Sequence, residues 1–313
     1  MRISFGITKD LRKCRKPVLA IGVFDGLHLG HRQLIQAAVR RAKEIGGTPV
    51  VMTFSPHPVH VLHPEINLPL VASLPHRLQL IAQLGVRVCV VVRFTKAFSR
   101  LLPEQFIRKY LVEKIGVAEV FVGDDFRFGQ DRAGTMDLFQ EAGERFGFRV
   151  NAVSIRQRAH QKISSTFIRD LIRQGSLSQA ARYLDRPVSV LGKVVRGDDR
   201  GKTLGYPTAN IQTANVLLPP PGVYVARATL DKKSYQGVAN IGYRPSFKNN
   251  GALTVEIHIF NFHRLIYGRD VIVEFFAKVR DEKSFCSRDD LVCQIKQDVR
   301  KARQWFKKHK KPF

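Results

Sequence analysis

The sequence predicts two domains of different class: an α/β domain built on a parallel sheet, then a small antiparallel β-barrel that ends in a helix. Over residues 1–185 apolar runs alternate with helical patterns, whereas short β-rich runs separated by turn residues dominate residues 186–313. A chain of 313 residues is also long enough for two ordinary cores. We therefore place the domain boundary between residues 185 and 186.

The first domain is expected to contain five strands that alternate with helices. Predicted strands cover residues 18–24, 49–54, 88–94, 119–122 and 149–153, and predicted helices cover 31–45, 75–84, 103–114 and 136–146. A helical stretch over 165–184, interrupted at Gly175, closes the domain. Repetition of strand, helix and strand predicts a parallel sheet with helices on both faces and with ligands at the carboxyl ends of its strands.

The second domain is expected to be all β until its last helix. Predicted strands cover residues 188–195, 222–230, 235–241, 254–260 and 270–279, with Gly, Pro, Asn and Asp turns between them. The final helix, 287–306, places apolar side chains close to the helical period, at Leu291, Ile295, Val299 and Ala302. We expect this helix to pack across the barrel.

Composition argues against a membrane or exported protein. No stretch approaches the roughly 18 apolar residues that a membrane span needs, and the first twenty positions are polar and basic rather than a secretory leader. Four cysteines show neither a C-x-x-C pair nor zinc spacing, so we expect free thiols in a reducing cytoplasm.

The net charge of +26 raises the question of polyanion binding. Residues 1–185 hold 28 basic and 15 acidic residues, and the rest hold 24 and 11, so each half carries the same excess of +13. A dedicated nucleic-acid module would concentrate this charge, and the single Trp305 with scattered phenylalanines offers no stacking platform. We therefore do not expect a nucleic-acid partner.

A histidine pair marks the first candidate site, where a buried strand turns into a helix. The segment GVFDGLHLGH over residues 22–31 suits a triphosphate, because glycines let the backbone approach closely and a helix amino end supplies unpaired N–H groups. Such donors stabilise the charge that grows on pyrophosphate during adenylyl transfer. A structural turn with incidental histidines is the alternative, and a zinc site lacks a third ligand. The candidate residues are Gly22, Phe24, Asp25, Gly26, His28 and His31.

Three further segments are expected beside this turn. Ser164, Ser165 and Thr166 offer hydroxyls at a helix start, and Arg169 follows one turn later, a set that can grip phosphates. Two loops should lie at the carboxyl edge of the sheet, where the second substrate enters. They contain His57 and the residues Asp124, Asp125, Phe126, Arg127 and Phe128.

A metal site at His57, His60 and His63 is not expected. The three histidines are spaced by three, but nearby prolines make a continuous helix implausible, so the spacing does not align them.

The second candidate site begins with a glycine-rich run over residues 197–211. It is not a Walker A motif, because three rather than four residues separate its glycines and because Gly205 and Pro207 discourage a helix after the lysine. We expect a hairpin flap that contains Gly197, Gly201 and Lys202 and ends in oxygen donors, Thr208 and Asn210, suited to magnesium and phosphates. Glu256, isolated on an apolar strand, fits a general base, and an edge glutamate facing water is the alternative.

The order of these motifs closely resembles the prokaryotic bifunctional riboflavin kinase/FAD synthetase family from about Gly22 to Gln304. The matching segments are GVFDGLHLGH, SPHP, VGDDFRFG, ISSTFIR, GKTLGYPTANI, GVYVA, GVANIGYRP, VEIHIF and IYG. The resemblance implies a Rossmann-like nucleotidyltransferase domain that transfers AMP from ATP to FMN. It also implies a riboflavin kinase barrel.

The resemblance assigns roles to the candidate residues. His28 and His31 stabilise adenylyl transfer, and Glu256 deprotonates the ribityl 5′-hydroxyl. The residues of ISSTFIR that hold ATP phosphates are Ser164, Ser165, Thr166 and Arg169. It further implies an FMN site in the first domain and a flavin site in the second. The FMN site comprises His57, Asp125, Phe126 and Phe128. In the kinase site, the implied Mg-ATP ligands are Gly197, Gly201, Lys202, Thr208 and Asn210, of which Thr208 and Asn210 hold Mg²⁺. The implied flavin ligands of the kinase site are Asn240, Arg244 and Glu256.

The implied partners are riboflavin, FMN and ATP, with FMN and FAD as products, and weak self-association stays open. Four positions depart from the family: Asp185, Lys202, Tyr243 and Asn261 stand where Gly, Arg, Thr and Asp are usual. None is a predicted catalytic residue, so we expect both activities to survive.

Three competing functions remain at this point. A monofunctional nucleotidyltransferase with a flavin-binding regulatory domain would not need Glu256 beside Thr208 and Asn210. A basic nucleic-acid-binding protein would require a salt-sensitive affinity for RNA. A class I aminoacyl-tRNA synthetase also has a histidine-glycine-histidine turn, but it needs a tRNA-binding body that this length hardly accommodates.

Overall fold

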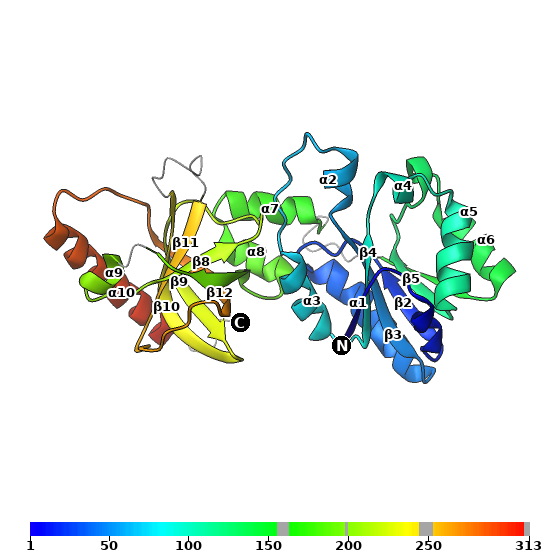
Figure 1. Ribbon diagram of the computed structural model, residues 1–313, viewed down its shortest axis with the longest axis horizontal. Helices are drawn as coiled ribbons and strands as arrows, with labels where there is room; N and C mark the ends of the chain where they lie inside the picture. Colours follow the sequence, from blue (N-terminus) through cyan, green and yellow to red (C-terminus); the bar gives the residue numbers. More distant parts are fainter. Residues whose placement is uncertain (155–162, 198–199, 244–252, 310–313) are drawn as a thin grey trace. The chain divides into compact units, whose positions relative to one another are not determined.

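The computed structural model describes residues 1–154, 163–197, 200–243 and 253–309 (Figure 1). The chain divides into two compact units. The first, here the sheet unit, comprises Met1–Leu68 and Arg77–Ser164, and the second, here the barrel unit, comprises Pro69–His76 and Ser165–Phe313. Each unit is described by itself. The functional boundary after residue 185 stays a prediction.

The sheet unit is built on six parallel strands in the order β1-β4-β3-β2-β5-β6. This arrangement confirms the predicted parallel sheet. The strands are β1 (Arg2–Phe5), β2 (Pro17–Ile21), β3 (Thr48–Ser55), β4 (Val88–Arg93), β5 (Glu119–Gly123) and β6 (Arg149–Val153). The helices are α1 (Leu29–Glu44), α2 (Pro58–Leu62), α3 (Leu74–Ala82), α4 (Lys96–Ser99), α5 (Pro103–Phe106) and α6 (Met136–Phe146), with a π-helix at Ile107–Ile115.

The core of the sheet unit lies around its central strands. All five residues of β2 are buried, because α1 covers the strand on one side and neighbouring strands flank it. Apolar side chains from the central strands and from the π-helix join Phe139 of α6 in one buried cluster. A strand buried on both faces carries a continuous apolar run, which is why β2 was evident in the sequence.

The barrel unit closes six antiparallel strands in the order β10-β11-β8-β7-β12-β9, as the predicted barrel requires. The strands are β7 (Val188–Val195), β8 (Ala209–Thr213), β9 (Gly222–Leu230), β10 (Lys233–Tyr243), β11 (Leu253–Ile259) and β12 (Asp270–Arg280). The helices are α7 (Ser165–Arg173), α8 (Leu177–Leu184), α9 (Arg200–Thr203) and α10 (Arg288–Lys308).

The last helix packs across the outside of the barrel, as predicted. Ala302 and Phe306 of α10 join Val225, Phe260 and Phe276 in an apolar cluster. The helix itself lies against β9, β10 and β12 (Figure 1). All buried residues of α10 lie in its second half, beginning with Asp298. The first half of the helix is therefore less deeply buried than the second half.

Two local predictions were wrong. The run over residues 197–211 contains a helical turn, α9, where a hairpin flap was expected. Residues 58–62 form the short helix α2, because proline is well tolerated at the first helical position, where its missing N–H has no helical partner. Arg244, a predicted flavin-binding residue, lies outside the described residues.

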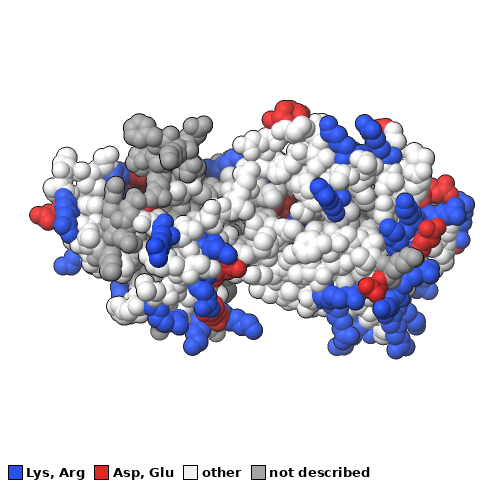
Figure 2. Space-filling model, viewed as in Figure 1, with Lys and Arg blue, Asp and Glu red and all other residues white. Residues whose placement is uncertain are grey.

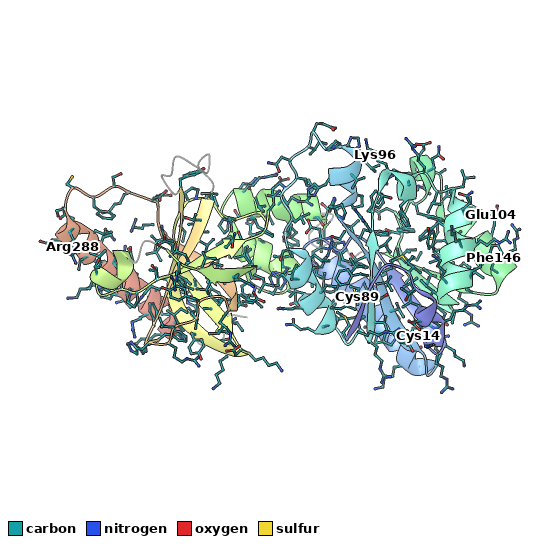
Figure 3. The ribbon with its side chains drawn as sticks, viewed as in Figure 1. Cys14, Cys89, Lys96, Glu104, Phe146 and Arg288 are labelled. Carbon is teal, nitrogen blue, oxygen red and sulfur yellow. The ribbon has the colours of Figure 1, made fainter. Side chains whose placement is uncertain are left out.

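The surface charge and the state of the cysteines match what the composition predicts. Lys and Arg outnumber Asp and Glu on the visible surface of each unit (Figure 2). All four cysteines lie in described segments as free thiols, and Cys89 is buried in β4 (Figure 3). No helix in the described segments is both long and apolar enough to cross a membrane.

Candidate active sites

The turn between β2 and α1 is tightly folded around its glycines. A Cβ at Gly22 would lie 2.7 Å from the Phe24 ring, so only glycine fits there. Phe24, Gly26 and Leu27 all have positive φ, at 54°, 80° and 43°. Asp25 is 1% exposed within this turn. The segment is therefore a compact loop at the carboxyl end of a central strand.

His28 and His31 form a stacked pair at the start of α1. Their ring centroids lie 3.6 Å apart, and the backbone N–H of His31 donates to His28 Nδ1 at 3.4 Å, which makes His28 the N-cap of the helix. A neutral imidazole that accepts at Nδ1 carries its proton on Nε2. His28 is 2% exposed, so its side chain is an integral part of the turn.

Burial keeps both rings uncharged at neutral pH. It lowers the pKa of His28 to about 4. Burial also lowers the pKa of His31 well below its usual value, and the nearby His28 and Arg77 lower it further. The helix amino end adds positive potential without a formal charge. The turn therefore offers neutral donors in a positive field, an arrangement suited to triphosphate.

Arg77 anchors the turn, and we did not single it out from the sequence. The side chain is 2% exposed, and its guanidinium donates to Val23 O at 2.7 Å and to Phe54 O at 2.9 Å. Thr53 Oγ1 donates to Val23 O as well, at 2.8 Å. Burial lowers the pKa of Arg77, and the Asp25 carboxylate opposes that shift. Its spacing from Leu80, Ile81 and Leu84 was the available signal, because it places Arg77 on the buried face of α3.

The sheet brings the two predicted loops to either side of this turn. β2 lies between β3 and β5, and all strands point the same way. His57 follows β3, caps α2 by accepting from Val59 N at 3.2 Å, and stands on one side. Asp125 and Phe126 follow β5 and stand on the other side.

An aromatic cluster accompanies these loops. Phe128 is 9% exposed and its ring centroid is 4.9 Å from that of Phe139, so it is part of the core. Phe126 is half-buried and stacks on Phe128 at 5.5 Å. Sequence reasoning missed two further rings, Phe54 near the end of β3 and Phe98 in α4, whose centroids lie 6.1 Å apart.

The phosphate-gripping segment crosses the division between the units. Ser164 belongs to the sheet unit, whereas Ser165, Thr166 and Arg169 lie in α7 of the barrel unit. Arg169 is 4% exposed, and its Nε donates to Pro69 O at 3.0 Å. Whether these residues meet the histidine turn stays a prediction.

Three predicted kinase residues lie in one row on the barrel. Asn240 of β10 pairs in register with Glu256 of β11, which pairs with Asn210 of β8. The next row, Ile241, Val255 and Ile211, is buried in the barrel core. Because successive side chains of a strand alternate between faces, the polar row faces outward. The register of the three strands therefore places Asn210, Asn240 and Glu256 side by side, although they are far apart in the sequence.

Two glycines of the preceding loop pack on the oxygen donors. A Cβ at Gly197 would collide with the Asn210 carboxamide, and one at Gly201 would lie 3.1 Å from Thr208 Oγ1. Thr208 and Asn210 are half-buried. The side chain of Lys202 lies outside the described part of the chain. The glycine positions predicted from the sequence therefore lie against the donors that were predicted with them.

His258 fixes the segment that leads into these donors. It lies two residues beyond Glu256 on the same side of β11, and its Nδ1 is 2.9 Å from Pro207 O. Its ring meets that of Tyr206 edge-on at 5.4 Å. Burial lowers the pKa of His258, the Pro207 carbonyl opposes this, and Arg303 adds to it. The neutral His258 ring, which donates from Nδ1 to Pro207 O, therefore links β11 to the segment just before Thr208.

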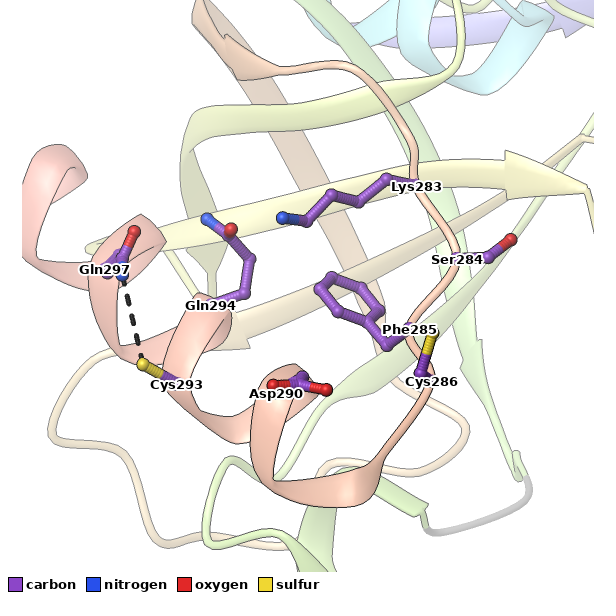
Figure 4. Close-up of a pocket in the computed structure, with 8 residues that line it drawn as sticks. All are labelled: Lys283, Ser284, Phe285, Cys286, Asp290, Cys293, Gln294 and Gln297. Atoms are coloured by element: carbon purple, nitrogen blue, oxygen red, sulfur yellow. Dashed lines mark hydrogen bonds between the residues drawn. The ribbon is translucent and has the colours of Figure 1, made fainter.

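A pocket of about 300 Å³ opens between α10 and the loop that precedes it (Figure 4). Lys283 and Phe285 line it from the loop, and Gln294 lines it from the helix. Lys283 and Gln294 point toward each other across it (Figure 4). Glu282, the residue before this stretch of the loop, places its carboxylate near Gly242, where a Cβ would also lie 3.3 Å from Asn240 Nδ2. The loop that lines the pocket therefore starts close to one end of the polar row.

In the described segments no group of three or more His, Cys, Asp or Glu side chains is placed to hold a metal ion. Any metal bound at the polar row would draw most of its ligands from substrate and water. Thr, Asn and Glu supply oxygen ligands, the type that Mg²⁺ prefers.

Comparisons with known proteins show which family the two parts of the chain resemble. A family model described as FAD synthetase matches residues 10–167, and one described as riboflavin kinase matches residues 184–306. The chain is 37% identical over 300 residues to the bifunctional riboflavin kinase/FMN adenylyltransferase of Bacillus subtilis (strain 168), covering 93% of each chain. It is 36% identical over 290 residues to the same enzyme of Escherichia coli (strain K12), covering 92% of each.

Among solved structures, a crystal structure described as a macrolide-efflux protein from Streptococcus pneumoniae matches with a TM-score of 0.82 at 29% identity, covering 95% of this chain and 97% of that chain. Full-length similarity and two consecutive family models confirm the resemblance found in the sequence. The chain therefore belongs to the bifunctional riboflavin kinase/FMN adenylyltransferase family, phosphorylating riboflavin with its C-terminal part and adenylylating FMN with its N-terminal part.

Proposed function

We propose that His28 and His31 are the catalytic residues of adenylyl transfer. An FMN phosphate oxygen attacks the α-phosphorus of ATP, and the bond to the bridging oxygen breaks to release pyrophosphate. Negative charge grows on that oxygen, where a proton held on His28 Nε2 and the amino end of α1 stabilise it. The stacked neutral pair at 3.6 Å is the observation that supports this role most directly. Gly22, Phe24, Asp25 and Gly26 shape the ATP-binding turn.

The remaining ATP contacts are assigned to α7 and the residue before it. Ser164, Ser165 and Thr166 bring hydroxyls and N–H groups to the β and γ phosphates. Arg169 uses its Nε to hold Pro69 O, so its contribution to the phosphates falls to the rest of the guanidinium.

FMN is proposed to bind beside the turn, between the loops after β3 and β5. His57 and Asp125 supply polar contacts, and Phe126 supplies an aromatic face to the flavin ring. Phe128, buried against Phe139, supports Phe126 from behind. Phe54 and Phe98 extend the aromatic surface on the opposite side.

In the barrel, Glu256 is proposed as the general base of riboflavin phosphorylation. It takes the proton of the ribityl 5′-hydroxyl, whose oxygen attacks the γ-phosphorus of ATP as ADP leaves. Thr208 and Asn210 hold the Mg-nucleotide, and Gly197, Gly201 and Lys202 line its phosphates. Mg²⁺, when bound, neutralises phosphate charge. Asn240, next in the row, and Arg244 orient the flavin chain.

The flavin ring of the kinase site is proposed to occupy the pocket beside α10. Phe285 offers an aromatic face, with the Lys283 ammonium 5.0 Å from the ring centroid. The loop that lines the pocket starts after Glu282, whose carboxylate lies near Gly242 and Asn240, so a ring placed in the pocket can direct its ribityl chain toward Glu256. We further propose a cytoplasmic location, where ATP and magnesium are supplied, and only weak self-association.

A chromatographic time course tests the two-site assignment. The purified protein receives riboflavin, ATP and magnesium, and is compared with the His28→Ala and Glu256→Ala variants. We expect the wild type to make FMN and then FAD, and His28→Ala to stop at FMN. Glu256→Ala should leave riboflavin unused but still convert supplied FMN to FAD. Loss of both activities in either folded variant would contradict separate sites.

A further inference from the structure

A buried aspartate lies behind the pocket without lining it. Asp298 is 2% exposed and is the first buried residue of α10, ahead of Ala302 and Phe306. Its Oδ2 accepts from Arg280 Nε at 2.9 Å, and its Oδ1 accepts from Gln294 Nε2 at 2.8 Å. Both carboxylate oxygens are therefore used, one toward the end of β12 and one toward the first half of α10.

These two bonds reach opposite walls of the pocket. Gln294 lines the pocket from the helix. Arg280 reaches the loop wall, because its guanidinium lies 5.6 Å from the Phe285 ring centroid and its Nη1 donates to Asp281 O at 2.9 Å. One carboxylate is therefore bonded both to Gln294 of the helix wall and to Arg280, which contacts the loop wall.

A contribution to folding stability does not explain why Arg280 and Asp298 form this buried ion pair. The side chains of Arg280 and Asp298 are 18% and 3% exposed, and desolvation of such a pair often exceeds the gain from its attraction. Apolar contacts of Ala302 and Phe306 already hold the second half of α10 on the barrel. The first half of the helix has no fully buried residue and is held by half-buried side chains, by a hydrogen bond from Arg288 to Thr203 O and by the Gln294 bond to Asp298. The Asp298 bond is the contact that acts on a residue lining the pocket.

We propose that Asp298 is a positioning residue for riboflavin. Acting through Gln294 and through Arg280, it holds the helix wall and the Phe285 wall at the spacing that accepts the flavin ring. This inference rests on the proposal that the pocket takes that ring. The ring is remote from the hydroxyl that reacts, so loss of the pair weakens ground-state and transition-state binding alike. Such a loss raises the KM of riboflavin and leaves kcat unchanged.

Steady-state kinase assays on five variants and the wild type test the proposal. Asp298→Asn and Arg280→Lys are expected to raise the KM of riboflavin about tenfold, while kcat and the KM of ATP change by less than about twofold. FMN adenylylation should be unchanged in both. A wild-type KM for riboflavin in folded Asp298→Asn overturns the proposal.

An apolar replacement separates positioning from stability. The double variant Arg280→Met with Asp298→Leu is expected to melt at or above the wild-type temperature, yet to keep the raised KM of riboflavin, because the fixed links to both walls are gone. Recovery of the wild-type KM in this variant shows a merely structural role and overturns the proposal.

Two further variants complete the design. Glu274→Gln breaks another partly buried ion pair of the barrel, Arg227–Glu274 at 2.6 Å, whose members do not line the pocket, and should leave the KM of riboflavin unchanged. Phe285→Ala probes the pocket itself. A raised KM in Phe285→Ala with a normal KM in Asp298→Asn rejects the role of Asp298 alone. An unchanged KM in Phe285→Ala rejects the pocket as the flavin site.

Discussion

At the residue scale, the proposed kinase site depends on a glycine whose surroundings leave no room for a side chain. A Cβ at Gly197 would collide with the carboxamide of Asn210. Gly197→Ala should therefore displace Asn210 and lower kcat/KM for riboflavin phosphorylation about a hundredfold, since displacements near 1 Å cost that much in well-aligned sites. FMN adenylylation should be unchanged. Steady-state assays of both reactions measure the effect.

Gly205→Ala is the matched control in the same loop. Nothing lies within 4 Å of its Cβ position, but its φ of +81° strains an alanine by about 1–2 kcal/mol. This variant should lose stability in a thermal melt and keep kinase activity. Equal activity in the two alanine variants would mean that Gly197 does not set the position of Asn210.

Residues with a local signature were predictable, and residues defined by distant partners were not. The glycines and histidines of the β2–α1 turn lie within ten positions, so their chemistry is visible in the sequence. Arg77 was missed because its partners, Val23 O and Phe54 O, are backbone atoms far along the chain. Asp185 is instructive in another way. Its φ of 54° at the end of α8 shows why glycine is favoured there and why aspartate, which tolerates this conformation, is accepted.

At the element scale, prediction succeeded where a periodic pattern was long or strong. Helix α6 and strands β6, β7 and β9 have the predicted bounds. β1 was missed because it lies at the sheet edge and most of its residues are exposed, so it carries no apolar run. β8 was missed because only Ile211 among its five residues is buried. The partner strands, rather than its own pattern, determine that β8 forms.

One contact between elements can be tested by comparing two amides. His258 Nδ1 bonds Pro207 O and so ties β11 to the segment that carries Thr208. An asparagine places its amide nitrogen near the position of Nδ1, whereas a glutamine places it near that of Nε2. His258→Asn should keep riboflavin kinase kcat/KM within about threefold of wild type, and His258→Gln should lower it about tenfold, the cost of one lost, well-placed hydrogen bond.

The same comparison contains its own control. Both variants remove the ring and its contact with Tyr206, so a loss that depends on the ring alone would appear equally in the two. Equal kinase activity of His258→Asn and His258→Gln would reject the link through Pro207. FMN adenylylation should be the same in both.

At the scale of the whole molecule, each unit has its own apolar core and its own buried histidine. The sheet unit contains His28 and His31, and the barrel unit contains His76, which is 2% exposed. Burial lowers the pKa of His76 to about 3, and the nearby Arg186 contributes to this shift. With a net charge of +26, the chain offers few carboxylates to compensate an added proton. Acid should therefore destabilise both units.

The sign of the effect follows from proton binding. In the unfolded chain a histidine has a pKa near 6.5, whereas in the folded chain burial lowers the pKa of His28 to about 4 and that of His76 to about 3. Below pH 6.5 the unfolded state binds more protons, so stability falls with falling pH until the folded-state pKa is reached. Each of these histidines should remove about 2 kcal/mol of unfolding free energy between pH 7.5 and pH 5.

Urea unfolding between pH 7.5 and pH 5 measures this loss. His76→Gln keeps a neutral polar side chain at the buried position, so the pH dependence should weaken by the contribution of one histidine, about 2 kcal/mol over that interval. His63→Gln, in which the side chain of His63 is 58% exposed, is the control and should keep the wild-type slope. If His76→Gln retains the full wild-type slope, protonation of the unfolded chain at His76 is not what limits the stability of the barrel unit in acid.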